Sequence, residues 1–557
     1  MNKKIPIELF KMIALKLIET ERLNRTGTLD LGNCALTEIP DEVCELYWLE
    51  ILILSGAYCD YYGNMIVSSN NRSRNSIEKI NPKIEKLSRL KELYIAGAIR
   101  FNIEVDFSIL GRLNNLCVLD VSNTIIQDIR FLKNLSRLES LNLREVSPNN
   151  YNYLNQFTNL RVLYLDDDSL ATNFSFLCKL VNLEVLHLYS FDLSDIKFLL
   201  SLKKLKVLSL IVTEVSNFQP LSFLHSLEFL SLSICKLSDI NFLKNLPKIK
   251  VLKLARINIS DISGLKNCSN LTSLDLSDNN ICDISVLKNC PSLMKLDLHN
   301  NPIKDYKVLT KLDKLYSLDL SYNKIVDISR IDVTRKLGVL KMNSNSLNVT
   351  DAINKFNQVK FLNLRFNNIY NKDLIIIKDF GNLQKLDLSY NQLSEIKCGA
   401  KSKHLESLDI SFNHTTNYDF LTFMPNLKSL VIRKNPSGMD NIEKIGSLNY
   451  LEQLDISYNN VVSLKFLSNL TKLINLDLSY NSIHDISYLE NLTNIRNLNL
   501  YHNGIYDVPV LKKLPNIHCL AIEKNDVNYR SFGSIDEYLE YIRQTSYDSY
   551  APARIKI

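Results

Sequence analysis

The chain lacks the long apolar runs and the strong charge bias that would direct it to a membrane or to nucleic acid. None of its 557 residues belongs to an uninterrupted apolar run of about 18, so no membrane-spanning helix is predicted. The opening MNKKIPIELF leads into a segment with charges throughout, unlike a secretory signal peptide. With 66 Lys and Arg against 60 Asp and Glu, the net charge of +6 favours neither nucleic acid nor a membrane surface as partner. We therefore expect a cytoplasmic protein.

Motifs for catalysis and for metal binding are also missing. The 11 cysteines include no C-x-x-C pair, which favours buried, reduced thiols over a disulfide framework or a metal site. The 8 histidines are scattered, and no H-E-x-x-H, G-x-S-x-G or G-x-x-x-x-G-K-[S/T] motif occurs. The sequence therefore predicts no enzyme activity, no cofactor and no bound metal.

What the chain has instead is a repeated phrase. An asparagine returns in steps of 22 residues, with two steps of 24, at Asn279, Asn301, Asn323, Asn345, Asn367, Asn391, Asn413, Asn435, Asn459, Asn481, Asn503 and Asn525. Each asparagine ends a stretch like LTSLDLSDN, with leucine-type residues at fixed places, and this register continues upstream to residue 26. A period of about 22 residues over about 22 copies predicts a solenoid whose neighbouring copies bury a shared apolar core.

The phrase also predicts its own local structure. The x-L-x-L stretch alternates apolar and polar residues, which indicates one short strand per repeat, stacked in parallel. The asparagine amide is expected to bond backbone groups of its own turn and of the adjacent turn. The second half, x-D-I-S-x-L, is too short for a full helix and predicts a 3-10 or short α turn on the convex side. The expected fold is an α/β repeat solenoid, a curved arc with a parallel sheet on its concave face.

The phrase L-D-L-S-x-N-x-I-x-D-I-S-x-L resembles the 22-residue class of leucine-rich repeats, which includes a regulatory subunit of protein phosphatase 1 and the bacterial internalins. The resemblance is strong over residues 116–527 and weaker over 26–115. It implies that a protein partner binds the concave face. The segment TGTLDLGNCALTEIPDEV (26–43) is similar to the start of the repeats in bacterial Roco-type proteins, but the phosphate-binding motif of their GTPase domain is absent from this sequence.

Both ends of a solenoid core need a cover. We predict an N-terminal helical cap over residues 1–25, repeats over 26–528, and a C-terminal cap helix with a tail over 529–557. Apolar residues of the first cap recur at four-residue spacing, at Leu9, Ile13 and Leu17. The segment IPIELFKMIALKL (5–17) also resembles the first helix of an F-box, which keeps a substrate-adaptor role as an alternative to a simple cap.

Two surfaces of the predicted concave face are candidates for partner binding, and the first is an apolar strip in the N-terminal half. Its candidate residues are Val162, Val185, His187, Tyr189, Val207, Ile211, Phe229, Ile234 and Val251. An exposed apolar strip commonly marks an interface. Strand propensity and packing along the ladder explain the same valines without any partner.

The second candidate is an aromatic ladder, a row of rings that directly precede the repeated asparagines. It comprises Tyr322, Phe366, Tyr390, Phe412, Tyr458 and Tyr480. Such rings are good anchors for a partner, whereas a ring at this position that shields the turn would belong to the framework. Aspartates run between the two strand leucines beside the ladder, and we expect a hydrated acidic stripe that disfavours nucleic acid.

A third candidate is an insertion in the second repeat. Leu49 and Leu90, the first leucines of consecutive repeats, are 41 residues apart, and the extra segment 56–76 contains Tyr58, Tyr61 and Tyr62. Long loops in a compact fold are often functional. We expect the insertion to fold over the N-terminal mouth of the arc.

Together these features predict a non-catalytic scaffold, monomeric on its own, that binds a protein partner on its concave face, with a bias toward repeats six to ten. The alternatives are a regulatory or targeting subunit of a phosphatase or a GTPase, and a substrate adaptor with an F-box-like N-terminal helix.

Overall fold

The computed structural model describes residues 7–59, 65–70, 73–100, 103, 105–146, 148, 150–167, 174–190, 193–212, 215–233, 235, 237, 239–347, 356, 358–370, 376–377, 381–435, 440–528, 537 and 540. Side chains are described for all of these except 7–11, 59, 167, 190, 212, 328 and 376–377. The chain divides into two compact units, Met1–Asn280 and Ile281–Ile557, which we call the N-terminal and the C-terminal unit.

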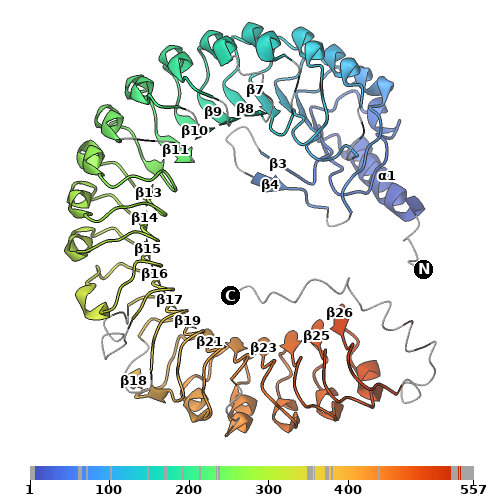
Figure 1. Ribbon diagram of the computed structural model, residues 1–557. Helices are drawn as coiled ribbons and strands as arrows, with labels where there is room; N and C mark the ends of the chain where they lie inside the picture. The colour runs from blue at the N-terminus through green and yellow to red at the C-terminus, as the bar shows by residue number, and fades with distance from the viewer. Residues whose placement is uncertain are drawn as a thin grey trace. The chain divides into compact units, whose positions relative to one another are not determined.

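Short parallel strands line the inner side of each unit (Figure 1). Within the described residues these repeat strands number 22, eleven in each unit. Those of the N-terminal unit are β1 (Thr28–Asp30), β2 (Ile51–Ile53), β5 (Glu92–Tyr94), β6 (Val118–Asp120), β7 (Ser140–Leu143), β8 (Val162–Asp167), β9 (Val185–Ser190), β10 (Val207–Val212), β11 (Phe229–Ser233), β12 (Val251–Lys253) and β13 (Ser273–Asp275). Those of the C-terminal unit are β14 (Lys295–Asp297), β15 (Ser317–Asp319), β16 (Val339–Lys341), β17 (Phe361–Asn363), β19 (Lys385–Asp387), β21 (Ser407–Asp409), β22 (Ser429–Val431), β23 (Gln453–Asp455), β24 (Asn475–Asp477), β25 (Asn497–Asn499) and β26 (Cys519–Ala521).

The outer side of each unit carries the second half of the repeats as 3-10 turns (Figure 1). In the N-terminal unit these are η1 (Val43–Glu45), η2 (Pro82–Lys86), η3 (Ser108–Arg112), η4 (Arg130–Asn134), η5 (Tyr151–Gln156), η6 (Phe174–Lys179), η7 (Lys197–Ser201), η8 (Gln219–Phe223), η9 (Asn241–Asn245) and η10 (Ser263–Asn267). In the C-terminal unit they are η11 (Ser285–Asn289), η12 (Lys307–Lys311), η13 (Ile328–Arg330), η16 (Asp419–Phe423), η17 (Ile442–Ser447), η18 (Lys465–Leu467), η19 (Ser487–Leu489) and η20 (Pro509–Lys513). A small parallel pair, β18 (Ile376–Ile377) with β20 (Lys397–Cys398), completes the C-terminal unit. The predicted α/β solenoid of short strands and turns is confirmed.

The core of each unit lies between its strands and its 3-10 turns. Neighbouring strands pair in register, so that Leu208 of β10 lies opposite Leu230 of β11. Both leucines are fully buried, as is Leu243 of the following turn. One repeat offers too little apolar surface to form a core alone, so each repeat is stabilised by its neighbours.

The repeated asparagine has the role that its spacing predicts. Nδ2 of Asn413 donates to the carbonyl oxygens of Leu388, 3.0 Å away, and Ile410, 3.0 Å away. Its Oδ1 accepts from the backbone N–H of Leu393 at 3.0 Å. Asn413 is buried, and its amide therefore satisfies backbone groups that water cannot reach.

Four successive strands of the N-terminal unit are longer than the others. β8, β9 and β10 have six residues each and β11 has five, whereas β13, which precedes Asn279, has three. In the sequence the asparagine position of these four longer repeats holds aspartate, phenylalanine, threonine and cysteine. Loss of the asparagine alone does not lengthen a strand, because β6 and β12, whose repeats hold Thr124 and Ile257 at this position, have three residues each.

The insertion forms an antiparallel hairpin, β3 (Ala57–Cys59) with β4 (Met65–Val67), on the inner side of the N-terminal unit (Figure 1). The ring of Tyr58 lies 4.2 Å from that of Tyr94 on β5, between ring centroids. Tyr58 also packs on a buried cluster that includes Ile53 and Val118. The described part of the insertion packs on the first repeats through Tyr58, whereas Tyr61 and Tyr62 lie outside the described residues.

Asn75 closes the insertion and restores the frame of the repeat. Its Nδ2 donates to the carbonyl oxygens of Leu31 at 2.9 Å and Leu54 at 2.8 Å. Its Oδ1 accepts from the backbone N–H groups of Cys34 and Leu36. The inserted segment therefore lies between β2 and the asparagine position, so it leaves the repeat on the strand side.

Helix α1 (Ile7–Asn24) precedes the first strand. Its buried residues are Ala14, Ile18 and Glu21, whereas Ile13 and Leu17 are only half-buried, so the predicted buried face is displaced by one residue. Glu21 ties the helix to the first repeats, because its Oε1 accepts from the backbone N–H of Gly27 at 2.8 Å and from Nε1 of Trp48 at 3.0 Å.

The far ends of the chain lie largely beyond the described part. Leu9 has no described side chain, and of the predicted C-terminal helix only Glu537 and Glu540 are described. No helix among the described residues combines the length and the apolar character needed to cross a lipid bilayer.

Candidate partner-binding surface

The apolar strip of the N-terminal unit is less exposed than expected. Val162 on β8 is 1% exposed, so the expected exposure is wrong there. Val185, Val207, Phe229 and Val251, on the four strands that follow, are half-buried. These four residues lie opposite one another on neighbouring strands of the sheet, in register. Cross-strand packing of this kind buries much of each side chain.

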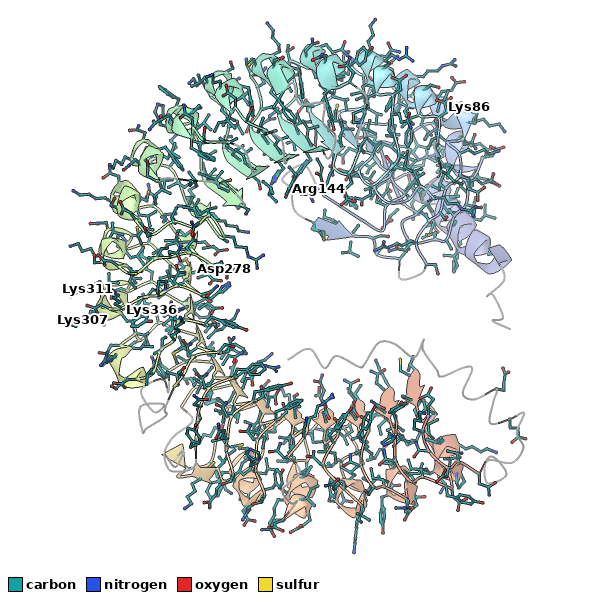
Figure 2. The ribbon with its side chains drawn as sticks, viewed as in Figure 1. Lys86, Arg144, Asp278, Lys307, Lys311 and Lys336 are labelled. Carbon is teal, nitrogen blue, oxygen red and sulfur yellow. The ribbon has the colours of Figure 1, made fainter. Side chains whose placement is uncertain are left out.

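The polar members of the strip gather around Arg144, which Figure 2 shows on the inner side of the N-terminal unit. Nη2 of Arg144 donates to the hydroxyl of Tyr189 at 3.0 Å, and the guanidinium lies 4.9 Å from the Tyr189 ring. His187 stacks on Tyr164, with 4.5 Å between ring centroids. Burial, and then the charge of Arg144, lower the pKa of His187 to about 4, so this imidazole is neutral at physiological pH.

Sequence reasoning named His187 and Tyr189 but missed Arg144 and Tyr164. The signal was present, because Tyr164 pairs with His187 across β8 and β9 at one position of the repeat. Ile211 pairs with Tyr189 across β9 and β10 and is half-buried. Ile234, the remaining predicted member of the strip, lies outside the described residues.

The aromatic ladder of the C-terminal unit contains two stacks of rings. Phe366, Tyr390 and Phe412 form the first, with 4.0 Å between ring centroids at both steps. Tyr458 and Tyr480 form the second, also at 4.0 Å. Phe366 is 44% exposed, and the other four rings of the stacks are half-buried.

Tyr322, the first member of the ladder, is 55% exposed. The ladder residues lie on the turns that end successive strands, and the backbone N–H of Tyr390, for example, donates to the carbonyl of Ser411 in the next repeat at 2.8 Å. The ladder is therefore a surface fixed to the sheet by its own backbone.

Every ladder residue has left-handed backbone geometry, with φ of 58° at Tyr322, 52° at Phe366, 54° at Tyr390, 54° at Phe412, 59° at Tyr458 and 53° at Tyr480. This conformation costs an L-residue roughly 1 kcal/mol or more, and asparagine tolerates it best after glycine. The same turn position holds Asn300, Ser344, Lys434 and Lys524 in other repeats of the unit, also with positive φ. The turn therefore forms without a ring.

Three cations lie over the rings of the ladder. The Arg365 guanidinium is 4.8 Å from the Phe366 centroid and 4.3 Å from that of Tyr390. Arg433 lies 5.9 Å from the ring of Phe412 and 4.6 Å from that of Tyr458. Nζ of Lys434 is 5.3 Å from the Phe412 ring. These contacts join the two stacks into one cationic and aromatic surface.

The expected hydrated stripe of aspartates is wrong for the four beside the two ring stacks, whereas Asp275, Asp297 and Asp319 are half-buried. Asp387, Asp409, Asp455 and Asp477 are buried. Each accepts hydrogen bonds from the backbone N–H and the hydroxyl of the serine two residues later, as Asp409 does from Ser411. Burial, and then the charge of Asp387, raise the pKa of Asp409 to about 7. The carboxylates are thus part of the turn framework.

Asp297, His299 and Asp319 of the C-terminal unit bring three potential metal-ligand atoms within 4.8 Å of one another. The repeat explains this arrangement without a metal. His299 occupies the place of the usual serine, and its backbone N–H and Nδ1 both lie 3.0 Å from Oδ1 of Asp297. Lys341 lies 3.4 Å from Asp319, between Nζ and Oδ2, and supplies a cation.

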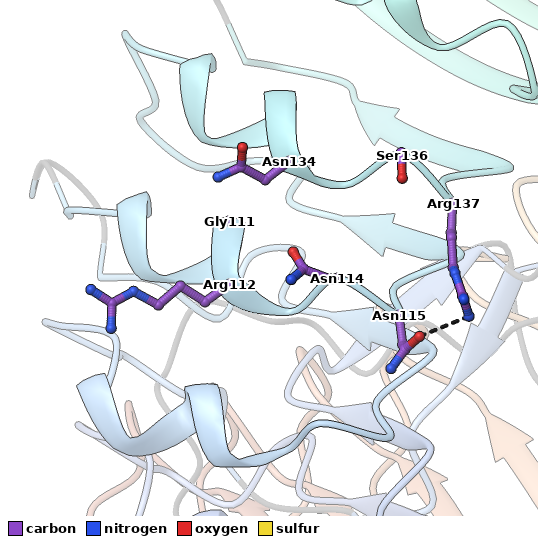
Figure 3. A pocket seen from close by; sticks show the side chains of 7 residues that line it. All are labelled: Gly111, Arg112, Asn114, Asn115, Asn134, Ser136 and Arg137. Carbon is purple, nitrogen blue, oxygen red and sulfur yellow. Dashed lines mark hydrogen bonds between the residues drawn. The ribbon is translucent and has the colours of Figure 1, made fainter.

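A shallow polar pocket lies at the turns that follow η3 and η4 (Figure 3). It is lined by Gly111, Arg112, Asn114, Asn115, Asn134, Ser136 and Arg137. Its two cations are already engaged, since Arg112 pairs with Glu85 and Arg137 donates to Oδ1 of Asn115 at 2.8 Å. No predicted site residue lines it.

The outer side of the C-terminal unit carries scattered lysines, such as Lys307 and Lys311 on η12 (Figure 2).

Comparisons with known proteins agree with this geometry. A family model described as leucine-rich repeats (2 copies) matches residues 247–289. A probable disease resistance protein of Arabidopsis thaliana is 32% identical over 101 residues, which is 18% of this chain and 10% of that protein. The match therefore spans about a tenth of the length of the curated relative.

Solved structures show the same fold. The mouse RP105/MD-1 complex matches with a TM-score of 0.54 and 18% identity over 94% of this chain and 95% of that chain. The TLR13–ssRNA13 complex matches with a TM-score of 0.55 and 20% identity over 89% of this chain and 73% of that chain. An internalin of Listeria monocytogenes is 25% identical over 62% of this chain and 88% of that chain, with a TM-score of 0.40. Repeat register, parallel strands and these likenesses agree: the chain is a leucine-rich repeat protein.

Proposed function

We propose that this protein is a non-catalytic interaction module of the cytoplasm that binds a partner protein along the aromatic ladder of its C-terminal unit. The leucine-rich repeat fold supports protein–protein interaction as the general role. The observation that carries the location is the choice of rings at a left-handed turn position where neighbouring repeats use asparagine, serine or lysine. Backbone conformations that a residue adopts at an energetic cost are concentrated at functional sites.

The chemistry of the ladder supports the same proposal. Tyrosine and arginine are the residue types that contribute most to binding energy at protein interfaces. Stacked rings have few rotatable bonds to restrict, so little side-chain entropy is lost when a partner binds. Arg365 and Arg433 are held over the rings in the free protein, so the surface is formed before the partner arrives.

The ladder can be tested by a substitution that the fold already accepts. In the double variant Tyr390→Asn/Phe412→Asn, asparagine occupies a turn position that Asn300 fills in the same unit. The variant should therefore keep its fold while it loses two stacked rings. Tyr450→Ser is the matched control. Tyr450 lies on the turn between η17 and β23, is 49% exposed, and has Lys472 over its ring.

The measurement is quantitative affinity capture of partner proteins from an extract of the source cells by the full chain. We expect the ladder variant to retain at most a tenth of the captured partner, because each buried anchor ring contributes roughly 1 kcal/mol or more. The Tyr450→Ser variant should capture the wild-type amount. Circular dichroism and a thermal melt establish that both variants fold. Undiminished capture by the ladder variant would refute the proposed site.

A further inference from the structure

The partners of the two ladder arginines set them apart from ion-paired cations of the C-terminal unit such as Lys428. Neither Arg365 nor Arg433 forms an ion pair with a residue of the described ranges. Lys428, by contrast, lies 3.1 Å from Glu406, measured between Nζ and Oε1. The hydrogen bond that Arg365 makes from Nη1 goes to the hydroxyl of Ser389 at 3.4 Å. Nε of Arg433 is buried and has no hydrogen-bond partner among the described residues.

The nearby carboxylates do not compensate these charges fully. Asp387, Asp409, Asp455 and Asp477 are buried below the ladder and turned toward serine N–H and hydroxyl groups. Burial and the neighbouring carboxylate raise the pKa of Asp409 to about 7, so part of its negative charge is absent at neutral pH. Burial and Asp477 raise the pKa of Asp455 in the same way. Arg365 acts on Asp409 and Arg433 on Asp455, so the guanidinium groups are compensated only in part and keep positive charge beside the rings.

We propose that the ladder binds an extended acidic segment of its partner, with one carboxylate on Arg365 and a second on Arg433. This inference rests on the proposed function and adds the chemistry of the partner. A guanidinium held flat on a ring presents its edge N–H groups to a carboxylate, which it binds with two hydrogen bonds. Lys434, between the two stacks, adds a third positive charge.

The repeat geometry sets the spacing of the two acidic residues. Arg365 follows β17 and Arg433 follows β22, and the intervening steps are β17 to β19, β19 to β21 and β21 to β22. Three steps of about 4.8 Å place the arginines about 14 Å apart. An extended chain advances about 3.3 Å per residue, so the two acidic side chains should lie about four residues apart. The residues between them face Tyr390 and Phe412.

An acidic peptide fits this surface better than single-stranded nucleic acid, although rings and arginines suit both. Nucleic-acid grooves track the backbone with many positive charges, because every nucleotide carries a phosphate. The ladder offers three cations above a row of four aspartates. Two carboxylates at a fixed spacing match its two arginines one to one.

The test is a selection from a displayed library of random 12-residue peptides on the full-length chain. Enriched peptides are then measured on wild type, on Arg365→Gln/Arg433→Gln, on Tyr390→Asn/Phe412→Asn, and on Lys428→Gln as a cation control away from the ladder. We expect enrichment of peptides with two Asp or Glu residues about four positions apart. Their affinity should fall at least tenfold on the arginine variant, weaken with salt, and stay unchanged on Lys428→Gln.

The other outcomes separate two claims: that the ladder is the binding site, and that its ligand is an acidic segment. Peptides without the acidic pair that still lose binding on Tyr390→Asn/Phe412→Asn would keep the ladder as the site but overturn the acidic partner. Peptides that bind the ring variant as well as wild type, or a library without ladder-dependent peptides, count against both. A fluorescent 12-nucleotide oligouridine serves as the nucleic-acid probe. If it binds wild type more tightly than every selected peptide and does not bind the ring variant, the proposed ligand would be RNA and not an acidic peptide.

Discussion

The inner sides of the two units are built from the same repeat but place their aromatic side chains differently. In the N-terminal unit the hairpin β3–β4 covers the first repeats, and Tyr94 and Tyr164 are buried under neighbouring rings. In the C-terminal unit the rings move to the turn that ends each strand, where Phe366 keeps 44% of its surface exposed. On the inner faces, Tyr94 and Tyr164 thus serve internal packing, whereas Phe366 keeps much of its ring in solvent.

Most repeats of the two units differ at one position. An asparagine there satisfies the turn through its amide, as Asn435 does in the C-terminal unit, and the residue before it has positive φ. In the repeats of β8–β11 the asparagine is replaced, the strands are longer, and Tyr164 and His187 lie within the sheet. The replacement alone does not lengthen a strand, because β12, which Ile257 follows at this position, has three residues.

The largest effect should come from removing one of these amides. Asn435→Ala leaves the carbonyls of Ile410 and Ile432 and the N–H of Thr415 without their partner. Each unsatisfied buried group costs about 1–3 kcal/mol, so the free energy of unfolding should fall by about 3–5 kcal/mol. Urea denaturation measures it. Cys235→Ala, at the same repeat position in the N-terminal unit, should change stability by about 1 kcal/mol; equal losses at both sites would contradict the comparison.

The second effect concerns pH and the buried aspartates of the C-terminal unit. Because the pKa of Asp409 is raised to about 7 in the folded state, the folded state binds this proton more tightly than the unfolded chain. Its contribution is full below the unfolded pKa of about 4 and disappears as pH rises through about 7. Asp409 faces Asp387, Ser411 and Arg365.

Lowering the pH from 8 to 5 should therefore stabilise wild type over Asp409→Asn by roughly 2 kcal/mol, at about 1.4 kcal/mol per pH unit within that window. Asparagine keeps an oxygen that accepts from the N–H of Ser411, so the turn is preserved. Urea denaturation of both proteins at several pH values isolates the difference. Parallel pH profiles for the two proteins would show that this carboxyl is not shifted.

A third effect should open the covered face of the N-terminal unit. Tyr58→Ser removes the ring that stacks on Tyr94 at 4.2 Å and packs on Ile53 and Val118. Loss of this aromatic contact should destabilise the hairpin by about 1–2 kcal/mol. Hydrogen exchange followed by mass spectrometry should show faster exchange in β3, β4 and β5, while the C-terminal unit exchanges as before. Unchanged exchange in β3 and β4 would mean that the hairpin does not depend on this stack.

The smallest effect on stability is expected where the effect on binding should be large. Tyr390→Asn loses ring stacking but relieves a left-handed tyrosine, so the free energy of unfolding should change by less than about 0.5 kcal/mol. Leu388→Ala, two residues earlier and fully buried, should cost about 2–5 kcal/mol. Chemical denaturation distinguishes them. A loss at Tyr390→Asn near that of Leu388→Ala would assign the ring to the framework.

Much of this fold follows from the sequence, because the asparagine, the leucine register and the 3-10 turn are each set within one repeat. The longer strands β8–β11 were not predicted, and replacement of the asparagine alone does not identify them, because Ile257 replaces it after the three-residue strand β12. The burial of Asp409 was missed for another reason. Periodicity alone predicts that a strand aspartate is exposed. The serine two residues later is the signal that was overlooked, because its N–H donates to the carboxylate and holds it in the turn.

The candidate site was harder to predict than the fold. The sequence placed the six ladder residues in one row, and the structure brings five of them into two stacks. The positive φ of this turn position, which non-aromatic residues such as Asn300 and Lys434 share, is a backbone property that the residue pattern alone did not reveal. Val162 illustrates the opposite error, since its place in the repeat predicts an exposed side chain and tertiary packing leaves 1% of it exposed.

The most direct test places a photoreactive benzoylphenylalanine at one position of each inner face, Tyr390 in the ladder and Tyr189 in the N-terminal unit. Both positions carry half-buried aromatic residues, so the probe suits each. After irradiation in a source-cell extract, the account predicts a discrete cross-link to a partner protein from position 390 and none from position 189. A cross-link from position 189 alone would contradict the account, and would assign the binding face to the N-terminal unit.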